Sequence, residues 1–569
     1  MRHRKHSPAR LHACLMLWVA LLGLPETADA QSSMDDAREA LAAGQARRAV
    51  GLLEEVVRTA PTPDAYLYLG VALANVRETA RALEVLTEGS TRYPDDSRFH
   101  GEIAGVHLAG RNVDLATEAL ERAIQVDPGD AYASDLLASI RLSEGDVREA
   151  LAIWNVVGQP EIDRISQNFA PGILDRTVPR ALAFEPGDTL GYAAWETTEA
   201  RLFASRLYSN VGLELEPSPR EARFNAIVNT SAHRNTRNDI LVDLVRGFLV
   251  ETTYFDYWDI ARTGVSWRSR YRWDKDRRQL RGQVVIPLPL PGLPVLELGD
   301  TWRWERWNLD RPIRPAFIAD ALFDYKVNAL AFNVGVTPHY RVELHGGLEY
   351  RNRDVTGTIG VLGMDQRNSG TLSFGTVLRP VDRRYKNQIR LDAFVARDSL
   401  LGDFDFNGGT ARFINRFEIR KSSHTLLDIS LSGGTLRGNA PVDHYFILGL
   451  GSVTEHALRA HVASDGGRYG QAPMGTDFVL LNTDLEYRVA TIPLFNTLSI
   501  PYIHVKAMAF FDSGKTFDRQ RVFSQNVWYK DAGAGLGFET PTHSFTILYG
   551  RDFVGNEHSF YAYVEPNIW

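Results

Sequence analysis

Two short motifs in the sequence come close to known chemical sites, and neither completes one. Residues 509–516, AFFDSGKT, approach the G-x-x-x-x-G-K-[ST] pattern of a phosphate-binding loop, but Ala509 replaces the first glycine and the context is a strand followed by a turn. His456 and His461 are five positions apart and lack the H-E-x-x-H spacing of a zinc site. This spacing indicates ordinary histidines of a loop. No G-x-S-x-G nucleophile motif is present. We therefore expect no catalytic residue, no cofactor, no metal ion and no enzymatic activity.

A third group of residues predicts a structural ion pair. Arg459 is the central charge of a glycine-rich loop, and two alternating strands follow it, at 480–488 and 509–514. An arginine held inside a structure requires a carboxylate. Asp512, on the second strand, is the expected partner, and Glu486, on the first, is a second candidate. The pattern favours a lock that holds the loop over a catalytic pair.

The order of these pieces resembles the BamA/TamA superfamily of outer-membrane assembly and secretion barrels, also called the bacterial surface antigen family. The resemblance implies a loop that tucks into a barrel lumen and pairs the arginine of a [VL]-R-G-[FY] motif with the aspartate of a downstream F-x-D-x-G strand. Here Arg459 and Asp512 take these places, whereas Ala460 replaces the glycine and His461 the aromatic residue. The literal match VRGF at 245–248 lies far upstream of any such strand.

The same family places five strands after the arginine loop. Five can be counted in this sequence, at 478–489, 502–511, 533–539, 544–550 and 559–566. The resemblance therefore covers most of the C-terminal two-thirds of the chain.

Composition limits the class of protein. The chain has 569 residues with 46 Gly, 27 Phe, 21 Tyr and 11 Trp, and beyond residue 30 it contains no apolar run long enough for a membrane helix. A closed barrel is the other structure that can span a bilayer, and its alternating strands escape hydropathy scans. A net charge of -7 and the lack of a basic stripe argue against a nucleic-acid partner.

The N-terminus predicts export. Basic residues up to Arg10 precede an apolar stretch at 15–24, and Ala28-Asp29-Ala30 forms a signal-peptidase site, so residues 1–30 are predicted to be a signal peptide. Cys14 is the only cysteine, so the mature chain would have no disulfide and no thiolate site.

Residues 31–160 carry an internal repeat. Prolines at 61, 94 and 128 are 33 and 34 positions apart, and the tetratricopeptide pattern can be followed between them. Its signature positions are Tyr66, Gly70, Ala82 and Pro94 in one unit, and Ala104, Ala116 and Pro128 in the next. These residues predict a short α-solenoid whose groove binds an extended peptide or a partner helix.

Residues 161–235 predict a small α+β domain. A strand, two helices and two further strands can be followed, with a Pro-Gly-Asp turn at 186–188 and an L-Y-S-N-V exit at 207–211. This order resembles a POTRA domain, the periplasmic module that precedes barrels of the superfamily, and the resemblance implies an open sheet edge that accepts a strand from a client. A generic α+β spacer is the alternative.

Residues 236–569 read as strands joined by polar loops. At 341–350, for example, apolar and charged residues alternate with a period of two, which is typical of a lipid-facing barrel with a wet lumen. At roughly 21 residues per strand and loop, this length predicts an antiparallel transmembrane barrel of 16 strands. The aromatic ending resembles the insertion signal of outer-membrane barrels, with Phe560, Tyr561, Tyr563 and Trp569 as its residues.

These features together predict an outer-membrane β-barrel of a Gram-negative bacterium with periplasmic N-terminal domains. The expected function is to capture polypeptide clients in the periplasm and to assist their insertion into, or translocation across, the outer membrane. The expected partners are outer-membrane lipid and a periplasmic polypeptide client or partner protein, bound on the repeats and the POTRA-like edge. Two alternatives remain: a tetratricopeptide-barrel porin for exopolysaccharide export, and a barrel-anchored interaction scaffold.

Overall fold

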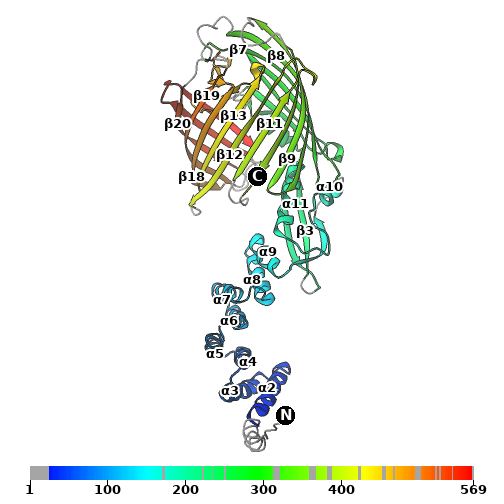
Figure 1. Cartoon of the computed structure of the whole chain (residues 1–569), viewed down its shortest axis with the longest axis vertical. Coiled ribbons are helices and arrows are strands. Elements are labelled where there is room, and N and C mark those ends of the chain that lie inside the picture. Colours follow the sequence, from blue (N-terminus) through cyan, green and yellow to red (C-terminus); the bar gives the residue numbers. More distant parts are fainter. Residues whose placement is uncertain are drawn as a thin grey trace, which may run out of the picture. The chain divides into compact units, whose positions relative to one another are not determined.

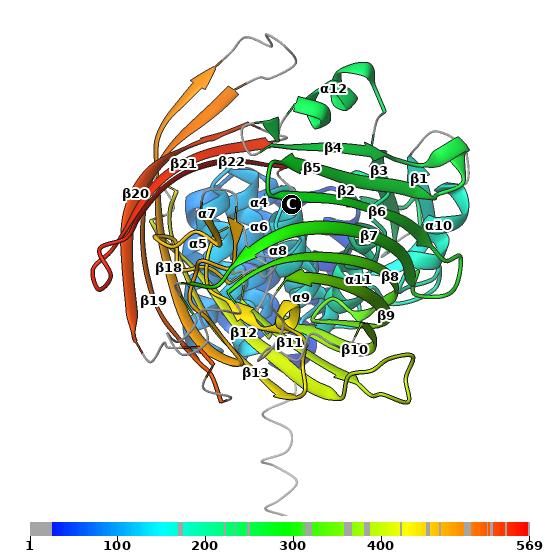
Figure 2. The same cartoon turned by 90° about the horizontal axis from the view of Figure 1, so that it is seen from above.

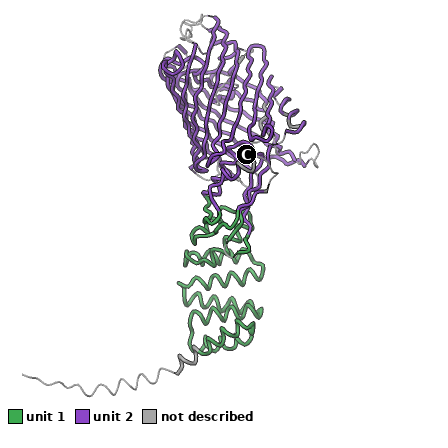
Figure 3. The backbone as a smooth tube through the Cα atoms, turned by 90° about the vertical axis from the view of Figure 1, so that its right-hand side faces the viewer, with its two compact units in different colours: residues 1–164, 186–192, 217–225 green, residues 165–185, 193–216, 226–569 purple. Residues whose placement is uncertain are grey.

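The computed structural model describes most of the chain after residue 24. The described residues are 25–168, 174–220, 223–233, 235–245, 247–248, 251–310, 312, 321–357, 367–380, 387–420, 424–450, 456–465, 468–493, 502–519, 522–523, 527–540 and 543–566. The first 24 residues of the predicted signal peptide lie outside this range. The chain divides into two compact units, which Figure 3 colours separately: residues 1–164, 186–192 and 217–225 form one, and residues 165–185, 193–216 and 226–569 form the other.

Residues 25–156 form consecutive antiparallel helices (Figure 1). They are α2 Pro25–Ala42, α3 Ala46–Thr59, α4 Pro63–Asn75, α5 Thr79–Arg92, α6 Arg98–Ala109, α7 Val113–Val126, α8 Ala131–Ser143 and α9 Val147–Val156. Thr62 and Asp130 cap α4 and α8. Each side chain accepts a hydrogen bond from the backbone N–H three residues later, at 3.2 Å for Thr62 and 3.0 Å for Asp130.

The predicted signature residues of the repeats lie where helices approach each other. Ala82, Ala104 and Ala116 are fully buried and Tyr66 is 3% exposed. A Cβ added to Gly70 in α4 would lie 2.5 Å from Leu86 of α5, closer than real atoms come. Small residues therefore set the spacing within each helix pair. Pro94 and Pro128 follow the ends of α5 and α7 and stop these helices.

Residues 161–232 follow the order β-α-α-β-β. The elements are β1 Glu161–Asn168, α10 Leu174–Ala181, α11 Tyr192–Ala204, β2 Tyr208–Pro217 and β3 Arg223–Ala232, and the sheet order is β1-β3-β2. β3 is the central strand, so β1 and β2 are the edges. Helix α11 docks on the end of β8 and on the turn after it: Arg201 Nε donates to the carbonyl of Thr337 at 3.1 Å, and the N–H of Tyr340 donates to the Thr197 hydroxyl at 3.1 Å.

The remaining residues form a large antiparallel barrel whose strand order is circular (Figure 2). In the described residues, fifteen strands of six residues or more follow one another: β4 Thr252–Tyr257, β5 Ser266–Asp274, β6 Arg277–Pro287, β7 Val295–Asn308, β8 Leu322–His339, β9 Val342–Gly357, β10 Asn368–Leu378, β11 Gln388–Ala396, β12 Phe406–Arg420, β13 Thr425–Gly438, β18 Asp477–Pro493, β19 Tyr502–Phe517, β20 Tyr529–Glu539, β21 His543–Asp552 and β22 His558–Pro566.

The predicted fold class is confirmed, with a strand number close to the 16 expected. Two-residue strands β15 Ser464–Asp465 and β16 Arg468–Tyr469 also pair within the sheet, and helix α12 Arg237–Val245 precedes β4. β22 lies beside β4, which joins the last strand to the first. Because β4 has only six residues, this seam is short; β18 and β19, by contrast, pair from Asp477 to Pro493.

The predicted alternation is visible in the register of β12 and β13. Phe413 is paired with Leu431, and both side chains are exposed on the outer surface. Arg416 is paired with Asp428 and forms a half-buried ion pair with it on the inner surface. The outside of the barrel is thus apolar and its inside charged, as a barrel in lipid requires. No helix in the described residues is long and apolar enough to cross a bilayer.

At one end of the barrel the lumen is dry, which the alternation did not predict. The loop after β13 contributes β14 Phe446–Ile447, paired with β17 Met474–Gly475. Its side chains join the inward-facing Trp307 and Tyr325 in one buried apolar cluster, which also includes Phe446, Leu448, Leu458, Tyr469 and Phe478. The expected wet lumen is therefore wrong for this end, because β7 and β8 present aromatic residues inward there and the loop covers them.

A glycine substitution tests the helix spacing. We expect Gly70→Ala to lower the free energy of unfolding of the repeats by about 1–3 kcal/mol, because the new methyl group overlaps Leu86. The measurement is chemical unfolding of the mature protein, followed by the helical circular-dichroism signal. Gly51→Ala in α3 is the matched control, since its Cβ would meet nothing within 4 Å; it should preserve stability or raise it by up to about 1 kcal/mol. Equal stability of the two variants would contradict the packing.

Candidate functional site: the loop inside the barrel

Arg459 lies in the loop between β13 and β18 and reaches a buried carboxylate on β19. Its Nη2 lies 2.6 Å from Asp512 Oδ1, its Nε lies 2.9 Å from Asp512 Oδ2, and its own backbone N–H donates to Oδ2 at 2.9 Å. The Asp512 side chain is fully buried. The guanidinium also lies over the ring of Phe510, 4.0 Å from the ring centre. The structure thus brings together the two residues that the sequence paired.

The second partner of Arg459 is Asp484 rather than Glu486. Arg459 Nη1 bonds the Asp484 carboxylate on β18. Glu486 accepts a bond from Lys506 at 3.2 Å instead, so the expectation for Glu486 is wrong. The reason is the path of the loop: its tip crosses β18 near Asn482, whose side chain donates to Asp512 at 2.8 Å, and Glu486 lies farther along the strand.

Glycines on the inner surface let the loop approach the wall. A Cβ added to Gly550 on β21 would lie 2.9 Å from the carbonyl oxygen of Arg459, and one added to Gly514 on β19 would lie 3.4 Å from Leu458 of the loop. The hydroxyl of Ser559 on β22 donates to the same Arg459 carbonyl. The loop tip is therefore tied to β18, β19 and β22, and it fits only where β21 lacks a side chain.

The two departures from the family motif are both buried at this contact. Ala460 is 1% exposed and its N–H donates to Asp531 Oδ2 on β20 at 2.6 Å. Its backbone does not adopt the left-handed conformation, so alanine fits where the motif has glycine. His461 packs edge-on against the ring of Tyr529, with ring centres 4.8 Å apart.

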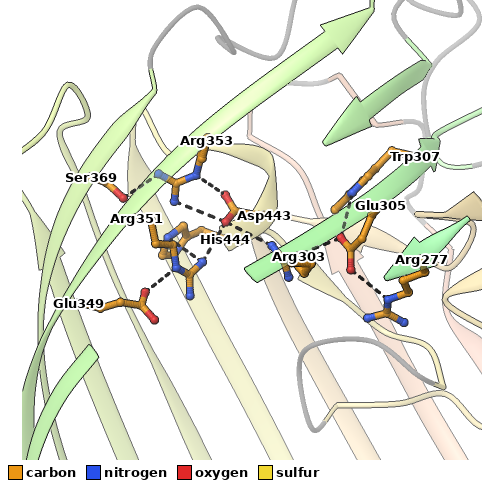
Figure 4. A network of polar contacts seen from close by, with 10 residues as sticks. All are labelled: Arg277, Arg303, Glu305, Trp307, Glu349, Arg351, Arg353, Ser369, Asp443 and His444. Carbon is orange, nitrogen blue, oxygen red and sulfur yellow. Dashed lines mark hydrogen bonds and ion pairs between the residues drawn. The ribbon is translucent and has the colours of Figure 1, made fainter. Parts of the chain in front are cut away.

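A second anchor holds the beginning of the same loop (Figure 4). Asp443 is fully buried and receives bonds from two arginines of β9: Arg351 Nη1 at 2.9 Å and Arg353 Nε at 3.0 Å. Arg303 of β7 lies 3.6 Å away. Three arginines on the barrel wall thus converge on one carboxylate of the loop, and a buried charge of this kind is held only by such pairing.

The network continues along the wall. Arg353 also donates to the Ser369 hydroxyl at 2.7 Å. Glu305, which is fully buried, accepts from Arg277 at 2.9 Å and from the Trp307 ring N–H at 3.1 Å. Sequence reasoning missed this cluster. Its only signal was arginine at alternate positions of one strand, 351 and 353, with an aspartate at the start of the loop.

The lumen contains a cavity of about 950 Å³, which is lined by the barrel wall and by loop residues such as Arg459. Its described lining has eight arginines and three acidic residues: Arg270, Arg272, Arg277, Arg281, Arg303, Arg351, Arg412 and Arg459 against Glu349, Asp428 and Asp484. Five of these arginines, Arg272, Arg277, Arg303, Arg351 and Arg459, are already paired with carboxylates, so the positive charge that faces the cavity is smaller than the count of arginines indicates. The arrangement holds the loop and leaves a modest attraction for negative charge.

The predicted insertion-signal residues divide between the two faces of β22. Phe560 is 73% exposed on the outside. Tyr561 lines the lumen cavity. The side chain of Tyr563 and the whole of Trp569 lie outside the described residues.

Comparison with known proteins supports both parts of this fold. The tetratricopeptide-repeat family model matches residues 34–97 and 73–131, which confirms the predicted repeats. The chain is similar to the solved structure of CdiB from Escherichia coli, with a TM-score of 0.50 and 12% identity over 72% of this chain and 77% of that chain. It is also similar to BamA from Haemophilus ducreyi lacking POTRA domains 1–3, with a TM-score of 0.44 and 12% identity over 71% and 84%.

A search of curated protein sequences finds no match. At 12% identity, the likeness to CdiB establishes the fold alone. The protein is accordingly a tetratricopeptide-like helical region followed by an antiparallel barrel of the type found in CdiB.

Asp443 provides a stability test of the second anchor. We expect Asp443→Asn to lower the free energy of unfolding by about 3–5 kcal/mol, because the three arginines lose the charge that compensates them. Urea unfolding of the barrel in detergent micelles measures it. In the matched control, Asp405→Asn, the aspartate is exposed and pairs with Arg397, so the change should stay within about 1 kcal/mol. Similar losses in both variants would contradict a special role for Asp443.

Proposed function

We propose that this protein is an outer-membrane barrel of a Gram-negative bacterium that captures polypeptide clients in the periplasm and assists their insertion or translocation. The observation that carries the proposal is the loop held inside a CdiB-type barrel by the buried pair Arg459–Asp512, with five long strands following it. A loop anchored so firmly across the lumen suits a barrel that handles chains under control. An open pore has no need of it.

The N-terminal parts would bind the client. Tetratricopeptide grooves commonly hold peptides, and Tyr132 of α8 is 58% exposed beside Gly101 of α6. Burial raises the pKa of neighbouring Glu102. The β-α-α-β-β region has the order of a POTRA domain, and its edge strands β1 and β2 could accept a strand from a client through main-chain hydrogen bonds.

The short seam between β4 and β22 would be the place where a client leaves the barrel sideways. Strand β4 limits the pairing with β22 to six residues, and it pairs with β5 over six residues as well, whereas the β18–β19 pair is much longer. Separating two strands breaks every hydrogen bond between them, so opening costs least beside β4. The proposal places lateral opening on the β22 side of β4, because the first and the last strand meet there and no turn joins them.

Export of an anionic glycan is the second candidate, because arginines dominate the lumen cavity. A conduit for a glycan would carry a stripe of acidic or aromatic residues along its lumen, and the described lining is mainly basic instead. The loop and its apolar cluster also fill one end of the lumen. A third candidate, a barrel that merely anchors the repeats, requires that the Arg459 loop can be changed freely.

Planar-bilayer conductance separates these candidates. The refolded wild type should show small, flickering conductance, and Arg459→Ala should show large, steady conductance, because the loop loses its charge pairing with Asp512 and Asp484 and leaves the lumen. Arg281→Ala is the matched control: Arg281 lines the same cavity, and no ion pair is described for it within the described residues. It should behave like wild type. Large, steady conductance in wild type and Arg459→Ala alike would favour glycan export.

Depletion tests the client function directly. If the protein assists other proteins, its loss should lower the abundance of at least one outer-membrane or surface protein, measured by quantitative proteomics of isolated outer membranes. Complementation with wild type should restore that abundance, and Arg459→Ala should not. Unchanged levels of every other outer-membrane and surface protein would contradict the proposal, and full rescue by Arg459→Ala would favour the scaffold.

A further inference from the structure

Three buried side chains meet at the tip of the loop. His461 Nε2 lies 3.6 Å from Asp531 Oδ1 on β20 and 3.9 Å from Asp552 Oδ2 on β21. One ligand atom from each residue lies within 4.8 Å of the other two. The two aspartate side chains are fully buried and the histidine side chain is 6% exposed. Sequence spacing could not suggest this cluster, because its members come from three separate segments.

The aspartates belong to a row of carboxylates on the inner surface. Asp512, Asp531 and Asp552 are direct neighbours across β19, β20 and β21. Like charges at directly opposite positions of a sheet repel each other, and more strongly when they are buried. Arg459 compensates Asp512 through a two-pronged contact. Its charge is shared with Asp484, so it does not also neutralise Asp531 and Asp552.

Two atoms of the cluster have no hydrogen-bond partner within the described residues: His461 Nε2 and Asp531 Oδ1. They face each other at 3.6 Å, beyond hydrogen-bonding distance. The other Asp531 oxygen accepts the N–H of Ala460, and Asp552 accepts the N–H groups of Val554 and Gly555. The hydrogen bonds that fix both carboxylates therefore leave lone pairs aimed at the imidazole.

We propose that His461, Asp531 and Asp552 bind one divalent metal ion, with Zn²⁺ the best fit. An imidazole and two carboxylates are a ligand set that Zn²⁺ accepts, with bonds of about 2.0–2.2 Å. Two ligand atoms of a tetrahedral ion at that distance lie about 3.4 Å apart. The observed 3.6 and 3.9 Å need only a small contraction, whereas the two carboxylate oxygens, which lie within 4.8 Å of each other, would have to approach by up to about 1.4 Å. The ion would neutralise the two aspartates and tie the loop to β20 and β21.

A protonated imidazole is the competing explanation. It would bring one positive charge to two carboxylates, and its Nε2–H would be too far from either oxygen for a hydrogen bond. A divalent ion supplies both charges and contacts all three atoms. Metal binding at this site does not depend on the proposed function, so it can be tested without knowing the client of the barrel.

Zinc binding by the refolded mature chain tests the proposal. After the protein has been stripped with a chelator, calorimetric titration should show one Zn²⁺ per wild-type chain. His461→Phe should lower the affinity by more than the roughly 10–100-fold that loss of an outer-shell partner costs. His456→Phe is the matched control, because His456 lies in the same loop, packs at a tilt against the ring of Phe478 and is outside the cluster; it should bind like wild type.

The unfolding temperature gives a second readout. Zn²⁺ should raise it in wild type and in His456→Phe, and leave it unchanged in His461→Phe. If His461→Phe fails to fold, Asp552→Asn takes its place, since asparagine keeps one acceptor oxygen for the turn at Val554 and Gly555. Absence of Zn²⁺ binding by wild type, or equal binding by the ligand variants, would overturn the proposal. So would an unfolding temperature that responds to pH and not to Zn²⁺, which would indicate a protonated histidine.

Discussion

The pairing of buried charges between one loop and the barrel wall is the constraint on which the interior of this protein depends. At the start of the loop the carboxylate of Asp443 lies among arginines of β7 and β9. At its tip the guanidinium of Arg459 lies between aspartates of β18 and β19. The loop carries opposite charges at its two ends, and the wall carries the complementary ones. A loop inserted in the reverse direction would bring like charges together at both ends, so the charges fix its direction as well as its position.

Glycines and apolar contacts complete what the charges begin. Between the two anchors, Phe446 and Leu458 pack into the aromatic cluster around Trp307. Gly550 removes the one side chain that would keep the Arg459 carbonyl away from β21. A buried ion pair adds little net stability because both charges lose their hydration, whereas the apolar cluster is stabilised directly by the hydrophobic effect. The two kinds of contact should therefore fail differently. Without the ion pairs the loop would lose its fixed direction in the lumen, and without the apolar cluster it would lose its tight packing against the wall.

Much of the fold could be predicted because its signals are local. The spacing of Pro94 and Pro128 and the small residues between them predict the repeats, and period-two alternation predicts the barrel strands. The pairing of Arg459 with Asp512 followed from a motif order. Partners that depend on the path of the chain could not be predicted: Asp484 and Glu486 occupy equivalent inward positions of β18, and only the crossing point of the loop distinguishes them.

The arginines around Asp443 and the aspartates around His461 lay beyond sequence reasoning for a related reason. The arginines lie on β7 and β9, well before the loop in sequence, and the aspartates lie on β20 and β21, well after it. Only the closure of the sheet brings both groups to one loop. The wet lumen was expected from charged residues at alternate positions, yet β7 and β8 turn aromatic at one end. Local alternation reports which face a residue lies on, and it does not report what covers that face.

Six of the arginines that line the cavity lie on β5, β6, β7 and β9, and Asp512, Asp531 and Asp552 lie on β19 to β21. Figure 2 shows these two groups of strands on opposite sides of the barrel. Buried acidic residues lie beside the arginines as well, among them Asp274, Glu305 and Asp443, so most of the charge is balanced where it lies. A charged group that enters the lumen can therefore bind there only by displacing a partner that is already in place. The cost of that exchange, rather than a field across the lumen, decides what the barrel can hold.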